Sequence, residues 1–249
     1  QRGGCAGIMP GMDAVGLLLD HITATRPQSR TALRKLKTRI AAEARAPLVR
    51  NDALLVRYRT DVAGGARARD PQLERVLMLN GIRSQSGVAT VTVITEPFAC
   101  PGRCVYCPTE AQAPKSYLTN EPAVRRALRN DYDPARQVTS RLEALRQTGH
   151  PTDKVELIIK GGPWSFYPPR YQRTFVQRCF EAANAFGTTA RVADRLTLDD
   201  AQRENETAQS RLIGITIETR PDYVDSAEIR RLRELGVTRV ELGVQTLEE

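Results

Sequence analysis

The spacing of hydrophobic positions changes at Gly87 and divides the chain into two parts. Beyond Gly87, short runs of β-branched and aliphatic residues alternate with longer segments whose apolar residues recur at helical spacing. The predicted strands are 87–95, 154–162, 212–221 and 237–245, and the predicted helices are 120–150 with a break near Pro134, 170–187, 197–210, and 226–236 with Ser226 as its N-terminal cap. This alternation predicts βαβ units and therefore an α/β fold with a parallel sheet, open or closed into a barrel.

The N-terminal part carries helical patterns instead. Apolar residues recur at helical spacing in a segment that has Ser29 as a suitable cap and stops at Pro47. A second, weaker helix is predicted over 70–79. We therefore expect a basic, mainly helical region over residues 1–86, followed by an α/β domain over residues 87–249.

The excess of positive charge lies entirely in this N-terminal part. Residues 1–87 hold 15 Lys and Arg against 7 Asp and Glu, whereas residues 88–249 hold 22 of each, which places the whole net charge of +8 at the N-terminal side. A basic region beside a neutral domain is typical of contact with nucleic acid, because neutralised phosphates release counterions. On charge alone, a solvated helix face is the alternative. The residues expected to contact nucleic acid are Arg34, Lys35, Lys37 and Arg39.

Other features of the sequence narrow the class of protein. The sequence has no run of the roughly 18 apolar residues that a membrane-spanning helix needs, and no signal-peptide pattern. We therefore expect a cytoplasmic protein that makes no membrane contact. Five cysteines in such a protein argue against a disulfide framework and favour metal binding or redox chemistry.

Three of the five cysteines stand close together in the segment EPFACPGRCVYCPTE, residues 96–110, directly after the first predicted strand. They are Cys100, Cys104 and Cys107. A structural zinc ion would require a fourth ligand, and no remaining Cys or His stands at a suitable spacing. Inert buried thiols are a second alternative, although a polar loop between prolines offers little apolar burial. An iron–sulfur cluster fits best, because three thiolates on a four-iron cluster leave one iron open to another ligand.

Unusual residues stand at the ends of the other predicted strands as well. Gly161 and Gly162 end the second strand, the segment ETRPD at 218–222 lies at the end of the third, and GVQ at 243–245 ends the fourth. The reactive site of a parallel α/β fold lies at the carboxyl ends of its strands, so these segments are expected to form one mouth. The chain has no Gly-x-Gly pair, which argues against a Rossmann dinucleotide site.

The cysteine motif resembles that of the radical S-adenosylmethionine superfamily. The resemblance rests on the pattern Cys-x3-Cys-x2-Cys, with the aromatic Tyr106 directly before the last cysteine, in the loop after the first predicted strand. The resemblance implies a partial (β/α)6-type barrel and a [4Fe-4S] cluster held by the three cysteines, whose open iron binds S-adenosylmethionine. In that superfamily an electron from the cluster cleaves S-adenosylmethionine to methionine and a 5′-deoxyadenosyl radical.

The same resemblance assigns roles to residues at the other strand ends. Gly161 and Gly162 would let the backbone approach the methionine end of the cosubstrate, which suits residues without a Cβ. Glu218, Arg220 and Gln245 would lie near its ribose or adenine. Taken singly, an ordinary turn for the glycines and a surface charge for Glu218 are the alternatives.

Longer motifs resemble the catalytic subunit of Elongator in its bacterial or archaeal form. They are SGVATVTVIT, CPGRCVYCP, KSYLTNEPAVRRALRNDYDP, GHPTDKVELIIKGG, IGITIETRPDY and ELGVQ, in this order. Enzymes of this family modify carbon 5 of the wobble uridine of tRNA. They take an acetyl group from acetyl-CoA, the deoxyadenosyl radical activates it, and its addition to the uridine gives 5-carboxymethyluridine. The resemblance therefore implies tRNA, acetyl-CoA and an electron donor as partners. It also implies a contact between Lys154 and acetyl-CoA, although Lys154 opens its strand and should face away from the mouth.

The sequence departs from the family pattern in two respects. Many members have Thr where this chain has Pro163, which removes a hydroxyl and a backbone N–H near the methionine end. The family's barrel continues beyond a fourth strand and is followed by an acetyltransferase-like domain, so we expect the chain to be cut short.

Two other functions are alternatives to the one that this resemblance implies. They are another radical S-adenosylmethionine enzyme, similar to porphyrinogen oxidases, and a non-catalytic tRNA-binding module with a structural metal.

Overall fold

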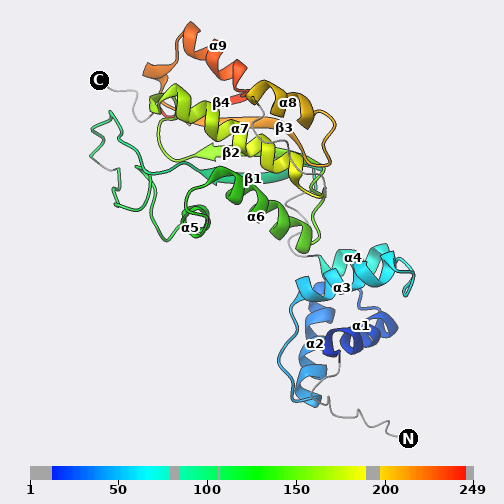
Figure 1. The fold of residues 1–249 in the computed structure, drawn as a ribbon. Coiled ribbons are helices and arrows are strands. Elements are labelled where there is room, and N and C mark those ends of the chain that lie inside the picture. The colour runs from blue at the N-terminus through cyan, green and yellow to red at the C-terminus, as the bar shows by residue number, and fades with distance from the viewer. Residues whose placement is uncertain (1–12, 79–84, 106, 189–196, 245–249) are drawn as a thin grey trace, which may run out of the picture. The chain divides into compact units, whose positions relative to one another are not determined.

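The structure, a computed structural model, describes residues 13–78, 85–105, 107–188 and 197–244 and is shown in Figure 1. It forms two compact units. The first consists of residues 1–85 with 144–150, and the second of residues 86–143 with 151–249. The sequence predicted a single boundary after residue 86, whereas the structure also groups 144–150 with the N-terminal unit.

The N-terminal unit contains four helices within its described residues. These are α1 (Ala14–Thr25), α2 (Arg30–Glu43), α3 (Asn51–Ala63) and α4 (Pro71–Leu77). The cap predicted at Ser29 is confirmed, because its Oγ accepts the Ala32 N–H at 3.1 Å. Helices α1 and α3 were not predicted. α1 begins after Asp13, whose carboxylate accepts the Gly16 N–H at 2.9 Å.

Apolar side chains from all four helices form the core of this unit. The buried set consists of Leu18, Leu19, Ile22, Leu33, Leu36, Leu54, Leu55, Tyr58, Leu73, Val76 and Leu77. Because every helix contributes, the unit is a helical bundle with a core of its own, and burial of this apolar surface stabilises it.

The second unit is built on a four-stranded parallel sheet, as the alternating pattern predicted. Its strands are β1 (Ala89–Ile94), β2 (Lys154–Lys160), β3 (Arg211–Thr219) and β4 (Arg239–Leu242), and they lie in the order β1-β2-β3-β4. All three neighbouring pairs are parallel, with Val91 beside Leu157 and Ile217 beside Val240. Since parallel strands run in one direction, their carboxyl ends meet at one edge of the sheet.

Five helices connect or follow these strands. They are α5 (Pro122–Arg129), α6 (Pro134–Gln147), α7 (Pro169–Ala185), α8 (Leu198–Asn205) and α9 (Ser226–Glu234). The predicted break at Pro134 is confirmed, since α5 ends before it and α6 starts on it. The predicted cap of α9 was wrong by one residue. Asp225, not Ser226, is the cap, and its carboxylate accepts the Glu228 N–H at 2.7 Å.

The two faces of the sheet differ in polarity. Along β2, Val155, Leu157 and Ile159 are buried, while the residues between them are only partly buried. The buried face packs against helices, and α6 and α7 lie across it in Figure 1. The other face carries polar and charged side chains such as Glu156, Lys160 and Glu218, which leaves it suited to a binding site.

Candidate active site

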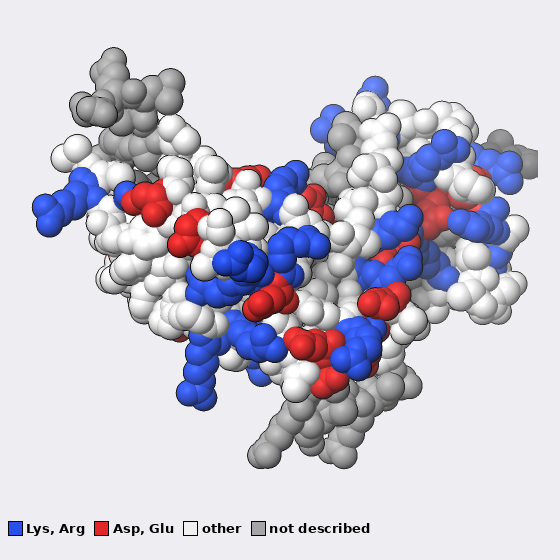
Figure 2. Space-filling model, turned by 90° about the horizontal axis from the view of Figure 1, so that it is seen from above, with Lys and Arg blue, Asp and Glu red and all other residues white. Residues whose placement is uncertain are grey.

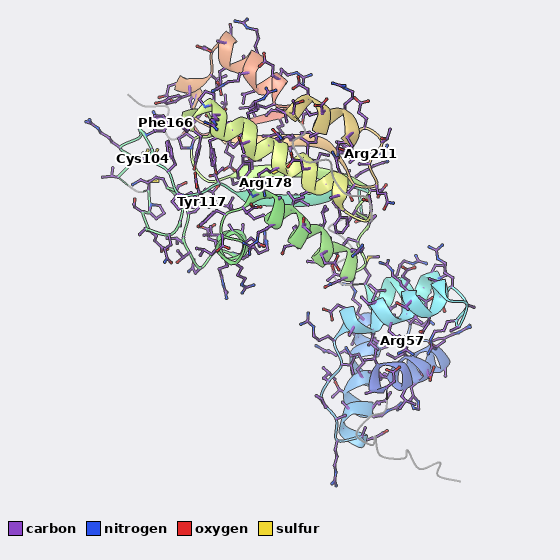
Figure 3. All side chains as sticks on the ribbon, in the orientation of Figure 1. Arg57, Cys104, Tyr117, Phe166, Arg178 and Arg211 are labelled. Carbon is purple, nitrogen blue, oxygen red and sulfur yellow. The ribbon has the colours of Figure 1, made fainter. Side chains whose placement is uncertain are left out.

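The carboxyl ends of the four strands surround a pocket of about 740 Å³. The segments after β1 and β2 and the ends of β3 and β4 contribute to its lining. The lining residues come from 100–108 and 115–117 after β1, 162–163 after β2, 218–222 at the end of β3, and 241–244 at the end of β4. Figure 3 shows Cys104, Tyr117 and Phe166 toward this end of the sheet and Arg211, the first residue of β3, toward the other end. The structure thus brings together the four segments that the sequence singled out.

Cys100, Cys104 and Cys107 all line this pocket, and each is half-buried with a free thiol. The Gly102 N–H donates to Cys100 Sγ at 3.4 Å. A Cβ on Gly102 would lie 3.4 Å from Cys100 Sγ and 3.7 Å from Cys104 Sγ, so the loop turns around this glycine with both sulfurs near it. Burial raises the pKa of the Cys107 thiol above its usual value.

The three cysteines are the donor set for the cluster that the motif implies. Among the described residues, no three His, Cys, Asp or Glu side chains approach closely enough to hold a metal ion. The three thiols nevertheless have the soft-ligand chemistry of an iron–sulfur site and face one pocket. Cys179 is different, because it is fully buried in α7, which raises its thiol pKa strongly. The three loop cysteines therefore fit a cluster, because their thiols are suitable ligands and line the same pocket. To bind it, the loop would have to bring the three thiols closer together.

Glu218 is the centre of a polar contact at the end of β3. The Tyr117 hydroxyl donates to Glu218 Oε2 at 2.7 Å, and Lys160 Nζ at the end of β2 forms an ion pair with Glu218 Oε1. Burial, and then the bond to Glu218, raise the pKa of Tyr117 far above its usual value, so the hydroxyl remains a donor. Both carboxylate oxygens are thereby held, and the side chain is fixed at the pocket.

Arg220 connects the cysteine loop to the segment after β3. Its Nε and one terminal nitrogen donate to the two oxygens of Asp222 at 2.8 and 2.7 Å. The bond to Asp222 is the main cause of the raised pKa of Arg220, and the nearby Cys100 and Cys104 raise it further. The same bond lowers the pKa of Asp222. A Cβ on Gly102 would lie 2.6 Å from the guanidinium, so Arg220 packs closely against this loop and its flexible side chain would have to shift for any larger residue.

The two predicted glycines after β2 differ in position. Gly162 lines the pocket with φ +119°, and the nearest atom to an added Cβ would be 3.8 Å away. Gly161 has φ +133° and is buried against the end of β1, where a Cβ would overlap Thr95 Oγ1 and lie 3.0 Å from Thr95 N. Close packing therefore explains Gly161, whereas Gly162 is the glycine that offers backbone to the pocket.

Of the three other predicted cofactor residues, the structure describes only Lys154. Lys154 is exposed at the start of β2, at the end of the strand opposite the pocket, as its place in the sequence indicated. Tyr106 and Gln245 lie outside the described residues. The residue that the sequence prediction missed is Tyr117, whose position after the cysteines and before α5 was the only local sign of its role.

The predicted nucleic-acid residues of α2 divide into exposed and buried ones. Arg34, Lys35 and Arg39 are exposed. The expectation that Lys37 lies on the exposed face was wrong, since only 5% of it is exposed. Position 37 lies one helical turn after Leu33 and therefore on the core face. There Lys37 Nζ donates to Asn51 Oδ1, and burial lowers the pKa of the ammonium.

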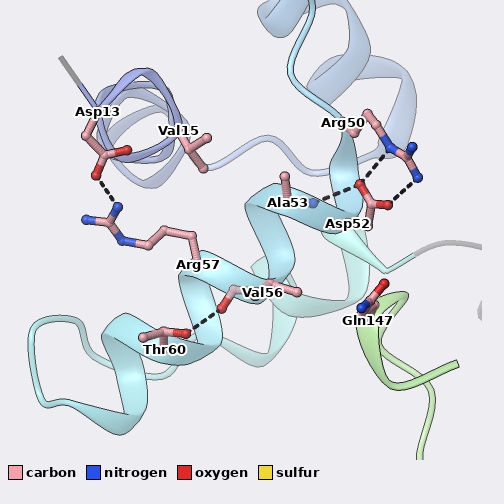
Figure 4. Close-up of a pocket in the computed structure, with 9 residues that line it drawn as sticks. All are labelled: Asp13, Val15, Arg50, Asp52, Ala53, Val56, Arg57, Thr60 and Gln147. Carbon is pink, nitrogen blue, oxygen red and sulfur yellow. Dashed lines mark hydrogen bonds and ion pairs between the residues drawn. The ribbon is translucent and has the colours of Figure 1, made fainter. Parts of the chain in front are cut away.

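A second cavity, of about 590 Å³, lies within the N-terminal unit between α1 and α3 and is shown in Figure 4. Val15 and Val56 give it apolar walls. Its charged side chains are already paired, Arg57 with Asp13 and Arg50 with Asp52. The cavity thus offers a ligand no cation or carboxylate that is free of a partner among the described lining residues.

Charges elsewhere on the surface are mixed. Figure 2 shows Lys and Arg interspersed with Asp and Glu over the face that it draws. In the part of the chain that the structure describes, no helix combines the length and apolar character required to cross a membrane.

Several known proteins are similar to this chain over about two thirds of its length. No family model matches the chain. The chain is 48% identical over 167 residues to the tRNA uridine(34) acetyltransferase of Dehalococcoides mccartyi, which covers 67% of this chain and 35% of that protein. It is 43% identical over 178 residues to the enzyme of the same name from Methanocaldococcus jannaschii, and the match covers 69% of this chain and 32% of that protein. It is 38% identical over 188 residues to Elongator complex protein 3 of Schizosaccharomyces pombe, and the match covers 71% of this chain and 33% of that protein.

A solved structure also matches. It is the archaeal Elp3 of Methanocaldococcus infernus with an N-terminal deletion, at 37% identity and a TM-score of 0.49, covering 65% of this chain and 30% of that one. The chain spans about a third of the length of these relatives. Sequence identity at this level over two thirds of the chain shows that it belongs to the family of the tRNA uridine(34) acetyltransferases and Elongator complex protein 3.

Proposed function

We propose that the chain is the radical S-adenosylmethionine part of an enzyme that modifies the wobble uridine of tRNA. The full reaction would use acetyl-CoA and give 5-carboxymethyluridine. The names of the relatives support tRNA uridine 34 as the substrate and an acetyl group as the group transferred. The observation that carries the proposal is the pocket in which three cysteines of one loop meet the ends of four parallel strands.

Cys100, Cys104 and Cys107 would hold a [4Fe-4S] cluster in this pocket. When bound, such a cluster supplies the electron, received from an external donor, that cleaves S-adenosylmethionine into methionine and a deoxyadenosyl radical. Thiolates are the ligands that iron–sulfur clusters require, and the three half-buried thiols can reach solvent-borne iron and sulfide.

The other pocket residues would bind and orient S-adenosylmethionine. Gly162 leaves its backbone open to the methionine end. Glu218, held by Tyr117 and Lys160, presents a fixed carboxylate, an acceptor for ammonium or hydroxyl donors of the cosubstrate. Arg220 is paired with Asp222, which fixes its guanidinium at the pocket and close to Gly102 of the cysteine loop.

The remaining partners involve residues outside the pocket. Exposed Arg34, Lys35 and Arg39 of α2 would contact tRNA phosphates. Lys154 is assigned to acetyl-CoA by the family resemblance alone, and it stands at the far end of β2 from the pocket.

Anaerobic reconstitution of the full-length protein tests the proposal. We expect a brown protein with about four iron atoms per chain that forms 5′-deoxyadenosine from S-adenosylmethionine. Replacing Cys100, Cys104 or Cys107 singly by Ala should remove both the iron and the product. Cys179→Ala is the matched control, because this thiol is buried in α7 and does not line the pocket. Colourless protein with stoichiometric zinc, or cluster and cleavage retained without one of the three thiols, would overturn the proposal.

A further inference from the structure

Tyr167 is not among the residues that line the pocket, but it contacts the segments after β1 and β2 that form it. It follows the short 3₁₀ turn η2 (Trp164–Phe166) and precedes α7, and only 3% of it is exposed. Burial raises the pKa of its hydroxyl to about 12, so the phenol is protonated at neutral pH. None of the binding roles assigned above uses this residue.

The Tyr167 hydroxyl joins the end of β1 to the turn after β2. It lies 2.7 Å from Thr95 Oγ1 and donates toward two carbonyl oxygens, those of Gly161 at 2.8 Å and Glu96 at 2.9 Å. Thr95 Oγ1 is itself 3.2 Å from the Gly161 carbonyl. Two buried hydroxyls therefore set the spacing between the start of the cysteine loop and the glycine turn.

The ring of Tyr167 continues this connection through aromatic contacts. It is stacked between Phe98 and Tyr171, with ring centroids 5.0 and 5.1 Å away. Phe98 stands two residues before Cys100 and also contacts Phe166 at 6.0 Å. Phe166 in turn meets Tyr223 at 5.8 Å. The rings thus come from the loops after β1, β2 and β3, which are three of the segments that line the pocket.

The turn that carries Tyr167 is also held by a contact that does not involve its hydroxyl. Gln172 Nε2 on α7 donates to the carbonyl oxygens of Trp164 at 2.7 Å and Tyr167 at 3.0 Å. Because the turn keeps this support, and because Phe can keep the ring stack, Tyr167→Phe removes only the hydroxyl. The structure therefore allows the positioning effect of the hydroxyl to be separated from the packing of the turn.

We infer that Tyr167 is a positioning residue of this site, which fixes the start of the cysteine loop relative to the Gly161–Gly162 turn and so sets where Cys100 faces the pocket. The inference rests on the proposed function for its purpose. Its geometric content concerns this chain's own residues and can be tested without any cluster.

Thiol labelling of the full-length protein, free of iron, tests the geometry. Each cysteine is alkylated with iodoacetamide and followed separately by peptide mass spectrometry. In Tyr167→Phe we expect Cys100 to label about fivefold faster, the change in a local opening equilibrium expected when one buried hydrogen bond is lost. Cys179 should stay protected, which reports that the unit remains folded. A parent-like rate at Cys100 would overturn the inference.

Two further variants keep the test specific. Tyr58→Phe removes a buried hydroxyl in the N-terminal unit, where Tyr58 donates to the Asp70 carbonyl, and it should leave Cys100 labelling unchanged. If it speeds labelling as much as Tyr167→Phe does, the effect is general destabilisation and the inference fails. Thr95→Val removes the partner hydroxyl. Combined with Tyr167→Phe it should add less than its own single effect, because the two hydroxyls contact each other and share the Gly161 carbonyl as a partner.

A spectroscopic measurement links this geometry to the proposed function. After reconstitution, Tyr167→Phe should retain iron but give an altered paramagnetic resonance spectrum of the reduced cluster in the presence of S-adenosylmethionine. An unaltered spectrum would count against a positioning role. If the parent protein takes up no cluster, the proposed function fails, while the labelling result still decides the role of Tyr167 in the loop.

Discussion

Among single residues, Tyr117 makes the contact on which the position of Glu218 depends. Tyr117→Phe leaves Glu218 Oε2 without its 2.7 Å donor in a partly buried pocket. We expect the free energy of unfolding to fall by about 1.5–3 kcal/mol, as for a hydrogen bond to a charged group. Chemical denaturation measures this loss, and a double-mutant cycle with Glu218→Gln measures the coupling between the two side chains. A coupling energy near zero would show that the two side chains are independent in solution.

The two glycines after β2 allow a matched comparison at the same scale. Both have positive φ values that other residues rarely adopt, but only at Gly161 would a Cβ overlap a neighbour, Thr95. Gly161→Ala should therefore lower the free energy of unfolding by about 1–3 kcal/mol more than Gly162→Ala, the usual cost of overpacking. Thermal unfolding of the two variants checks this. Equal losses would mean that backbone strain alone requires a glycine at position 161.

At the scale of elements, the start of α9 shows how adjacent capping residues are distinguished. Asp225 accepts the Glu228 N–H at 2.7 Å, while Ser226 is the first helical residue. Asp225→Ala should destabilise the protein by about 1 kcal/mol, and Ser226→Ala should change it by only a few tenths. Equilibrium denaturation of both variants measures the difference. A larger loss for Ser226→Ala would place the cap where the sequence first predicted it.

The elements also show which features a sequence can predict. The strands were predicted from short β-branched and aliphatic runs that alternate with helical segments, and the parallel direction that this implies placed the cysteines, Gly162 and Glu218 at one edge. The prediction that Lys37 is exposed was wrong because lysine was treated as a polar residue. Its aliphatic chain lies on the same face of the helix as the buried Leu33. The bond between Tyr117 and Glu218 spans 101 residues, and Tyr167 meets Thr95 across 72. No local pattern encodes such pairs, so only the folded chain shows them.

For the molecule as a whole, the excess positive charge of the N-terminal region gives a prediction about tRNA. Replacing exposed Arg34, Lys35 and Arg39 together by Ala should weaken binding and reduce the slope of log affinity against log salt by about one unit per lost phosphate contact. Lys37→Met is the matched control from the same helix, because Lys37 is buried and donates to Asn51. It removes one positive charge that cannot reach a phosphate, so the slope should stay that of the parent. Binding titrations at several salt concentrations measure both variants. If Lys37→Met lowers the slope as much as the loss of one exposed residue does, total charge rather than the exposed face of α2 governs binding.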